Sequence, residues 1–357
     1  MKNDGGRDRV DYNRQMAKSR SLLPPLDKAV VYLDQFAISN LFKAKTSKEA
    51  ERDSHKEYWA SLLTKVERAV LLHQAIFPSS SIHLDETIPY HSPSDLQIFH
   101  ETLGDAEFCS PREIVAEQEW AFFEAYLEGR PRPTLSTSVD EVLKGERNIW
   151  LPALHITGKT DWTVIAPMVR RDRDVNERAM KRLADRWKEE KPTFEEALSV
   201  ELAALAEVRK DQLLNTTDMR VVAQFSEMRK AFEAHGFKEA VLEVVKFWEW
   251  PENQHLPEHR ISAHLFAALA RQYAGNRKKE PLGIMNDIKA VASYGPYVDA
   301  IFVDNHCATL VKEANLSLKA RVFSLNSGDA FAAYIDDLCE RASPEVRAFA
   351  LQRFGVK

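Results

Sequence analysis

The sequence predicts an α/β fold, in which a parallel sheet is flanked by helices and interrupted by a large, mostly helical insertion. Short β-prone apolar runs near both ends of the chain carry this prediction, at residues 29–36, 298–305 and 320–327. Segments with the helical spacing of apolar residues separate these runs. Strands that alternate with helices are typical of a parallel sheet, so we expect these runs to pair side by side.

The N-terminal part supplies the first strands. A polar leader over residues 1–27 precedes an apolar run at 29–33, which predicts a strand buried on both faces that stops at Asp34. Residues 53–75 carry apolar side chains at helical spacing and predict an amphipathic helix. Residues 76–88 predict a second short strand region that ends at a pair of acids. This part of the chain therefore predicts a strand, a helix and a further strand.

The middle of the chain is predicted to be helical. Ser110 to Glu113 and Thr193 to Glu196 each form a capping box, in which a hydroxyl residue precedes a glutamate by three positions. The predicted organisation is an α/β domain from 28–109 and 276–357, with 110–275 as a helical insertion. An aromatic cluster inside the insertion, Phe247, Trp248 and Trp250, is expected to pack in a core or against a protein partner.

Composition excludes several classes of protein. The chain has 357 residues, 44% hydrophobic and 29% charged, as in ordinary globular proteins. Its three cysteines form no CxxC pair, which argues against a disulfide framework or a thiolate zinc site and predicts a cytoplasmic location. No apolar run approaches the ~20 residues that cross a membrane. The net charge of -5 means that nucleic-acid binding requires a local basic patch.

Acidic residues at strand ends are the most informative feature. Asp34 and Asp304 directly follow apolar strand runs, Glu86 closes the shorter run, and Asp287 begins a predicted helix. Ligands of open parallel sheets bind beyond the carboxyl ends of the strands, so these acids are expected to form one cluster. Carboxylates gathered in this way require a proton or a cation, and oxygen ligands favour Mg²⁺ or Mn²⁺. The alternative is that Asp34 is a turn residue and Asp287 a helix cap.

Five segments resemble those of the PIN-like nucleases. In order along the chain they are residues 31–35, 77–87, 286–290, 298–305 and 321–326. The resemblance covers roughly 29–105 and 280–340, and it leaves out the helical middle. It implies a metal-dependent endoribonuclease that hydrolyses phosphodiester bonds.

Site residues follow from the same resemblance. The carboxylates that it implies as metal-binding and catalytic are Asp34, Glu86, Asp287 and Asp304. Asp299, at the other end of its strand, is a further metal-ligand candidate, whereas Asp85 should alternate to the opposite strand face from Glu86. Secondary or substrate contacts are expected from Asn305, His306 and Ser324.

Two basic stretches are candidates for holding a nucleic-acid backbone. Arg277, Lys278 and Lys279 precede the Asp287 motif and form the proposed patch. The stretch 170–188 is basic but interleaved with acids, which favours a solvated helix face.

Two other functions remain compatible with the sequence. One is a non-catalytic binding or scaffold protein that keeps the PIN-like fold and uses the insertion as a partner surface. The other is a DNA endonuclease, because no feature of the sequence chooses between RNA and DNA.

Overall fold

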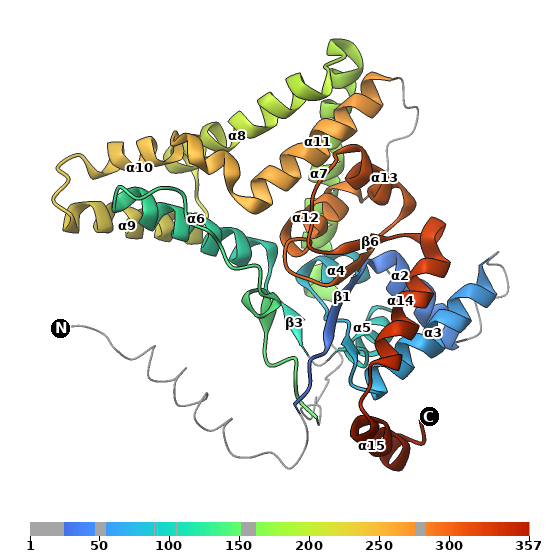
Figure 1. Ribbon diagram of the computed structural model, residues 1–357. Coiled ribbons are helices and arrows are strands. Elements are labelled where there is room, and N and C mark those ends of the chain that lie inside the picture. The colour runs from blue at the N-terminus through green and yellow to red at the C-terminus, as the bar shows by residue number, and fades with distance from the viewer. Residues whose placement is uncertain are drawn as a thin grey trace.

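The protein is a mixed α/β molecule, mostly helical, with one small parallel sheet (Figure 1). The computed structural model describes residues 25–46, 55–88, 90, 92–104, 106–150, 162–275 and 283–356. Of the leader predicted for 1–27, only 25–27 belong to this part. In the part described, no helix is long and apolar enough to cross a membrane.

The sheet has four parallel strands, as the sequence predicted. In spatial order they are β2 (Ala75–Ile76), β1 (Ala29–Leu33), β5 (Ala300–Phe302) and β6 (Arg321–Phe323). The register pairs Val31 with Ala300 and Leu33 with Phe302, so the carboxyl ends of the two central strands are level. This alignment brings the residues that follow β1 and β5 to one edge of the sheet.

The two faces of the sheet belong to two cores, because successive side chains of a strand point in opposite directions. Val31 and Leu33 of β1 lie in one core, while Val30 and Tyr32 lie in the other. Helices on the Val31 side are α2 (Gln35–Thr46), α3 (Lys56–Leu71), α5 (Pro93–Glu101), α14 (Gly328–Glu340) and α15 (Pro344–Phe354). Helices on the Tyr32 side include α4 (Ser81–Thr87), α12 (Ile284–Tyr294) and α13 (Asn305–Glu313).

The second strand region predicted from the sequence is wrong over most of its length. The strand β2 ends at Ile76, and the chain then forms helix α4. Pro78 cannot donate a ladder hydrogen bond, and the Ser80 side chain accepts from the His83 backbone N–H as a helix N-cap. Glu86 is therefore delivered by a helix instead of by a strand end.

Among the described residues of the predicted insertion, six α-helices account for most of the length. They are α6 (Pro111–Leu127), α7 (Trp162–Glu190), α8 (Phe194–Asn215), α9 (Met219–Ala234), α10 (Ala240–Trp248) and α11 (Pro257–Ala274). Both predicted capping boxes are confirmed, at Ser110 and at Thr193. A short antiparallel pair, β3 (Glu107–Phe108) with β4 (Leu143–Lys144), joins this region to the sheet side of the molecule.

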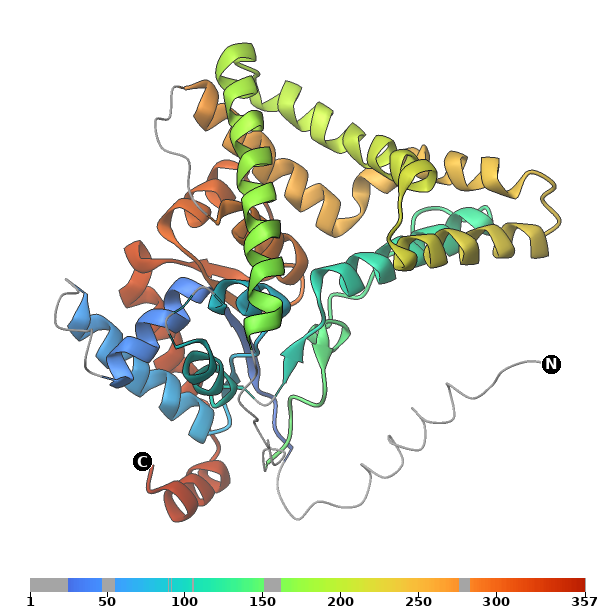
Figure 2. The same cartoon turned by 180° about the vertical axis from the view of Figure 1, so that it is seen from behind.

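The helices of this region divide between an arm and the body. Parts of α6, α9 and α10 pack around a separate aromatic core that contains Phe123, Phe232 and Phe247. Figures 1 and 2 show these helices extending away from the sheet. By contrast, α11 and α7 contribute Leu265 and Met180 to the core on the Tyr32 side of the sheet. Part of the predicted insertion is thus continuous with the core that supports the sheet.

Candidate active site

A cavity of about 720 Å³ lies at the carboxyl end of the two central strands, where four acids converge. Asp34 follows β1, Asp304 follows β5 by two positions, Asp287 is in the first turn of α12, and Glu86 is on α4. The other residues that line the cavity are Gln35, Phe36, Ser39, Asp85, Val169, Asp172, Arg173, Asn176, Glu177, Met180, Gly283, Ile284, Met285, Asn286, Asn305 and His306.

Asp34 is fixed between the sheet and helix α2. Its backbone N–H donates to the Phe302 carbonyl at 2.9 Å, and its carboxylate Oδ1 accepts from the Gln35 N–H at 2.8 Å. The residue is only 6% exposed. Burial, followed by the nearby charges of Glu86 and Asp304, raises the pKa of Asp34 to about 8.

Asp304 and Asp287 enter the cavity from helix N-termini. The Asp304 Oδ1 accepts from the Cys307 N–H at 2.6 Å and caps α13. Helix α12 begins after Gly283, whose φ of 89° is left-handed and favours glycine. Burial, with the charges of Asp34, Asp304 and Glu86, raises the pKa of Asp287 well above its ordinary value. The geometry therefore makes both residues helix-start residues and members of the acid cluster.

Glu86 is anchored through the helix that carries it. The His83 ring lies one turn before it, with Nε2 2.6 Å from the Leu33 carbonyl and Nδ1 2.9 Å from Ser80 Oγ. The side-chain amide of Asn286 donates to Glu86 Oε1 at 2.9 Å. Burial raises the pKa of Glu86, while the Asn286 hydrogen bond and the Arg173 charge oppose this shift. Glu86 is thus tied to the strand of Asp34 and to the helix of Asp287.

Asp85 also lines the cavity, which corrects the expectation that only one of the two acids points there. Neighbours on a strand point to opposite faces, but neighbours on a helix with 3.6 residues per turn lie about 100° apart. Burial raises the pKa of Asp85, with Lys289 opposing and Asp172 adding to the shift.

The remaining predicted contacts divide into two groups. Asn305 and His306 line the cavity, where Asn305 Oδ1 accepts from the Asn326 N–H and His306 Nε2 lies 3.0 Å from Gln272 Oε1. Ser324 does not line it, and instead its backbone N–H donates to Ser327 Oγ at the start of a 3-10 turn. Arg277, Lys278 and Lys279 lie outside the described residues.

Asp299 is at the other edge of the sheet, and its assignment as a metal ligand of this cluster is wrong. Its Oδ2 accepts from the Val30 N–H at 2.8 Å, and its backbone N–H donates to the Val30 carbonyl at 3.0 Å. Asp299 precedes β5, and parallel strands place their amino ends at the opposite edge from their carboxyl ends. The carboxylate therefore closes the start of the β1–β5 pair.

Helix α7 forms a wall of the cavity that the sequence did not predict. Six of its residues line the cavity, namely Val169, Asp172, Arg173, Asn176, Glu177 and Met180. These residues stand at positions 169, 172–173, 176–177 and 180. Steps of three or four positions place them on one helix face. That periodicity was the available signal, but the abundance of charge in 170–188 favoured a solvated face. Asn286 and Phe36 were also missed as site residues.

The cavity is lined by carboxylate oxygens, which are the donor type that hard divalent cations prefer. Four of the carboxylates come from four separate elements, and three of them have a raised pKa because of burial and neighbouring negative charge. Oxygen ligands of this kind suit Mg²⁺ or Mn²⁺. In the part of the chain that the structure describes, no three His, Cys, Asp or Glu side chains are grouped closely enough to hold a metal ion. The carboxylates surround the cavity without forming a closed set of ligands.

The chain matches no family model, no curated protein and no solved structure with which it was compared.

Proposed function

We propose that the protein is a metal-dependent nuclease with a PIN-like fold that hydrolyses phosphodiester bonds in RNA. The observation that supports it most directly is the convergence of Asp34, Glu86, Asp287 and Asp304 on one cavity. Buried like charges cost stability unless a proton or a cation neutralises them. An acid cluster of this kind is therefore suited to binding cations at neutral pH.

The four carboxylates would hold one or two Mg²⁺ or Mn²⁺ ions. When bound, such an ion supplies Lewis acidity, which lowers the pKa of water and stabilises the charge on a phosphate. Asn286 orients Glu86 by donating to Oε1, which would leave Oε2 for the cation. Asp304 uses Oδ1 to cap α13, which would leave Oδ2 for the cation. Hydrolysis by water then requires no nucleophile from the protein.

RNA is the proposed substrate because of the segments that resemble PIN-like nucleases. Four of these segments include β1 with Asp34, the start of α12 with Asp287, β5 with Asp304, and β6. The remaining segment, residues 77–87, departs from the expectation because it forms helix α4 where a strand was expected. The delivery of an acid by α4 nevertheless keeps Glu86 at the cavity.

A second candidate function is binding to a protein partner through the arm. Leu214, Met219 and Val241 lie in or beside the arm helices and are 80%, 75% and 53% exposed. Large apolar side chains exposed on the arm would be available to a protein partner. In a scaffold protein this surface would function without catalysis, so loss of the acids would leave partner binding intact.

The test is a cleavage assay with the full-length chain on RNA and DNA of the same sequence, in Mn²⁺, Mg²⁺ or EDTA. We expect metal-dependent cleavage of RNA, and a loss of about 100-fold or more in Asp34→Asn, because it removes a carboxylate from the cluster. Asp299→Asn is the matched control, since this aspartate lies at the other edge of the sheet and an asparagine oxygen can still accept from Val30.

Each outcome separates the candidates. Preferential cleavage of DNA would favour the endonuclease alternative. Normal turnover by Asp34→Asn would contradict the proposed catalytic site. No cleavage of either substrate would contradict the nuclease function and favour the scaffold function.

A further inference from the structure

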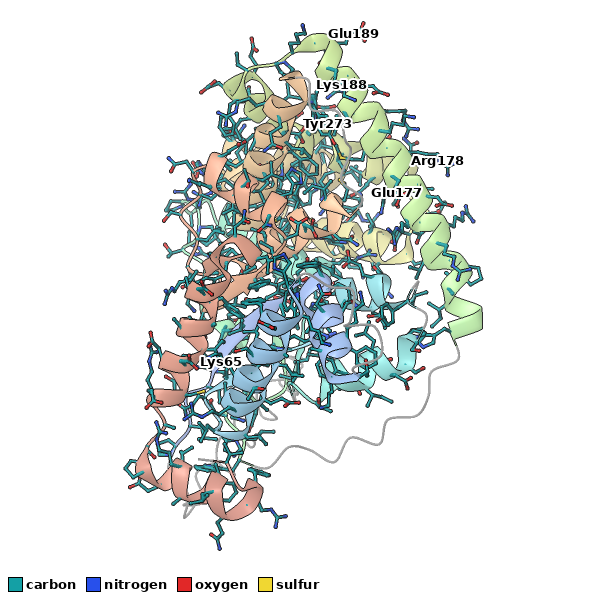
Figure 3. The ribbon with its side chains drawn as sticks, turned by 90° about the vertical axis from the view of Figure 1, so that its right-hand side faces the viewer. Lys65, Glu177, Arg178, Lys188, Glu189 and Tyr273 are labelled. Atoms are coloured by element: carbon teal, nitrogen blue, oxygen red, sulfur yellow. The ribbon has the colours of Figure 1, made fainter. Side chains whose placement is uncertain are left out.

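The charges of the cavity are unevenly distributed between its walls. The wall at the sheet edge carries the four acids and no lysine or arginine, whereas the wall made by α7 carries Arg173 beside Asp172 and Glu177. Among the described residues that line the cavity, Arg173 is the only lysine or arginine. Figure 3 shows α7 along one side of the molecule, with Glu177 and Arg178 part-way along it. This helix therefore supplies the cavity with a permanent cation, which the sheet edge does not.

Arg173 is held in place on the cavity face of α7. Its Nε donates to Glu177 Oε1 at 3.0 Å, a pair one helical turn apart. The guanidinium charge also acts on Glu86, where it opposes the rise in pKa that burial causes. A guanidinium has five N–H donors, so the bond to Glu177 leaves others for a phosphate. Arg173 thus stands between a carboxylate on its own helix and the acid cluster across the cavity.

Phe36 gives the cavity an apolar contact surface. It is two residues after Asp34, in the first turn of α2, and is 40% exposed. Trp59 packs edge-on against it, with ring centroids 5.6 Å apart and an interplanar angle of 80°. This contact supports the ring from one side while part of it remains open to the cavity. An exposed aromatic ring supported in this way can stack with an unpaired base.

We propose that Arg173 binds a phosphate next to the scissile one and that Phe36 stacks against an unpaired base, so that the site takes RNA as a single strand. This inference rests on the proposed nuclease function. The acids with their cation would take the scissile phosphate, and Arg173 and Phe36 would take groups on either side of it. A base that stacks on a protein side chain is not paired, so a duplex would have to open before it could bind.

The size of the cavity agrees with this substrate class. Its volume of about 720 Å³ lies within the ~300–1,000 Å³ that is typical of sites for a single small ligand. Such a cavity holds a short stretch of one strand. Helix α7 has 29 residues and forms one wall, which restricts access from that side.

The experiment measures binding of a labelled single-stranded RNA and of its duplex to the full-length Asp34→Asn protein, with Mg²⁺ and with EDTA, across a salt series. Each further change is made in this background. We expect Arg173→Ala to weaken single-strand binding about tenfold. The slope of log affinity against log salt should decrease by about 0.7, as expected for one phosphate contact. Phe36→Ala should weaken binding about tenfold at all salt concentrations.

Two matched variants test for a merely structural role. Arg178→Ala removes a cation from the same helix that does not line the cavity, so it should leave the slope unchanged. Glu177→Gln breaks the ion pair but keeps Arg173, so it should maintain or tighten binding. Equal slopes for Arg173→Ala and Arg178→Ala, or equal weakening by Glu177→Gln and Arg173→Ala, would overturn the assignment of Arg173. Duplex binding as tight as single-strand binding, or no binding of RNA, would overturn the substrate class.

The two proposals fail in different ways. RNA that binds in an Arg173-dependent manner but is never cleaved would contradict the nuclease function alone. Cleavage by the unmodified protein with an unchanged KM in Arg173→Ala, together with equal salt slopes, would contradict the inference about Arg173 alone.

Discussion

An aspartate flanks each end of strand β5, and the surroundings of the two carboxylates differ. Asp299, before the strand, accepts a backbone hydrogen bond from Val30 across the β1–β5 pair. Asp304, after the strand, caps a helix and also faces a cavity with Asp34, Asp287 and Glu86. The residue type and the position next to a strand are the same. The difference is that only the carboxyl edge gathers several acids around an open space.

Cations and backbone groups satisfy the polar side chains at the amino edge. Lys28 is 3% exposed, and its Nζ donates to the Ile149 carbonyl at 2.7 Å. Arg147 Nη1 donates to the Lys28 carbonyl, and Arg147 Nε lies 3.2 Å from Asp140 Oδ1. At the carboxyl edge, by contrast, the charges that shift the pKa of Asp34 are those of other carboxylates, Glu86 and Asp304. Accumulated like charge therefore distinguishes the acids of a candidate site from an acid with a structural role.

The largest expected effect is stabilisation by a divalent cation. We expect saturating Mn²⁺ to raise the free energy of unfolding by about 2.7 kcal/mol at 100 times its dissociation constant, because it binds only the folded cluster. Asp34→Asn should lose most of this gain, and Asp299→Asn should retain it. Thermal unfolding with and without Mn²⁺ measures both. An equal gain in all three proteins would remove the distinction between the two edges.

Truncation of Asp299 should have the next largest effect. Asp299→Ala leaves the buried Val30 N–H without its 2.8 Å acceptor, which costs about 1–3 kcal/mol of stability. Metal-free Asp34→Asn should change stability in the opposite direction, since it removes the cost of keeping this buried carboxyl protonated at neutral pH. Urea unfolding in EDTA compares the two variants. Destabilisation of both by the same amount would show that Asp34 is a structural acid like Asp299.

The stability of the metal-free protein should decrease as the pH rises from 6.5 to 8. Asp34 has a folded-state pKa of about 8, above its ordinary 3.8, so it keeps its proton in the folded state and loses it in the unfolded state over this range. The expected loss is roughly 1.5 kcal/mol for this group alone. Glu86 and Asp287, whose pKa values are also raised, contribute in the same direction.

Histidines define the lower limit of that pH range. Burial lowers the pKa of His73 and His83 to about 4 and also lowers that of His100 and His259, so protonation of these residues in the unfolded state favours unfolding and opposes the acid effect. Each histidine recovers about 0.4 kcal/mol between pH 6.5 and 8, nearly all of it below pH 7.5. Above pH 7.5 the three acids determine the slope. Urea unfolding at several pH values in EDTA measures it, and Asp34→Asn should flatten the curve. A stability that is constant or increases from pH 6.5 to 8 would refute the prediction.

The smallest expected effect is at the bond between Asn286 and Glu86. Asn286→Ala removes a 2.9 Å hydrogen bond and should cost about 1 kcal/mol. Because this bond lowers the pKa of Glu86, its loss should also raise that pKa further and weaken Mn²⁺ binding. Calorimetric titration with Mn²⁺ measures the change, and Asn305→Ala, which changes another lining amide, is the control. Unchanged affinity in Asn286→Ala would show that Glu86 does not need this orientation.

The sequence predicted the parts of the fold in which local pattern and tertiary position agree. The run that contains Val31 and Leu33 is apolar on both faces, so a buried central strand was the natural interpretation. The capping boxes at Ser110 and Thr193 are local hydrogen-bond motifs, which require no tertiary contact to form. These features are readable because a few neighbouring residues determine them.

The parts that were not predicted depend on contacts distant in sequence. The segment of Glu86 has apolar residues that suit a strand, but the Ser80 cap and the bond from His83 to Leu33 favour a helix. Arg173 was interpreted as solvated because nothing local shows that its helix passes the acid cluster. Asp299 was named as a further candidate although it precedes the strand, and the direction of the strand places it at the opposite edge from Asp304.

The pairing of β1 with β5 has a consequence for how the protein folds. The bond between Val30 and Asp299 joins residues 269 positions apart, and Asp34 lies one residue beyond β1. Closing so long a loop is slow, because its entropic cost must be met before any contact across it forms. During synthesis the arm helices can fold while β1 still waits for its partner. The acids of the cavity therefore meet only late, and an unfinished chain that lacks β5 carries none of the assembled site.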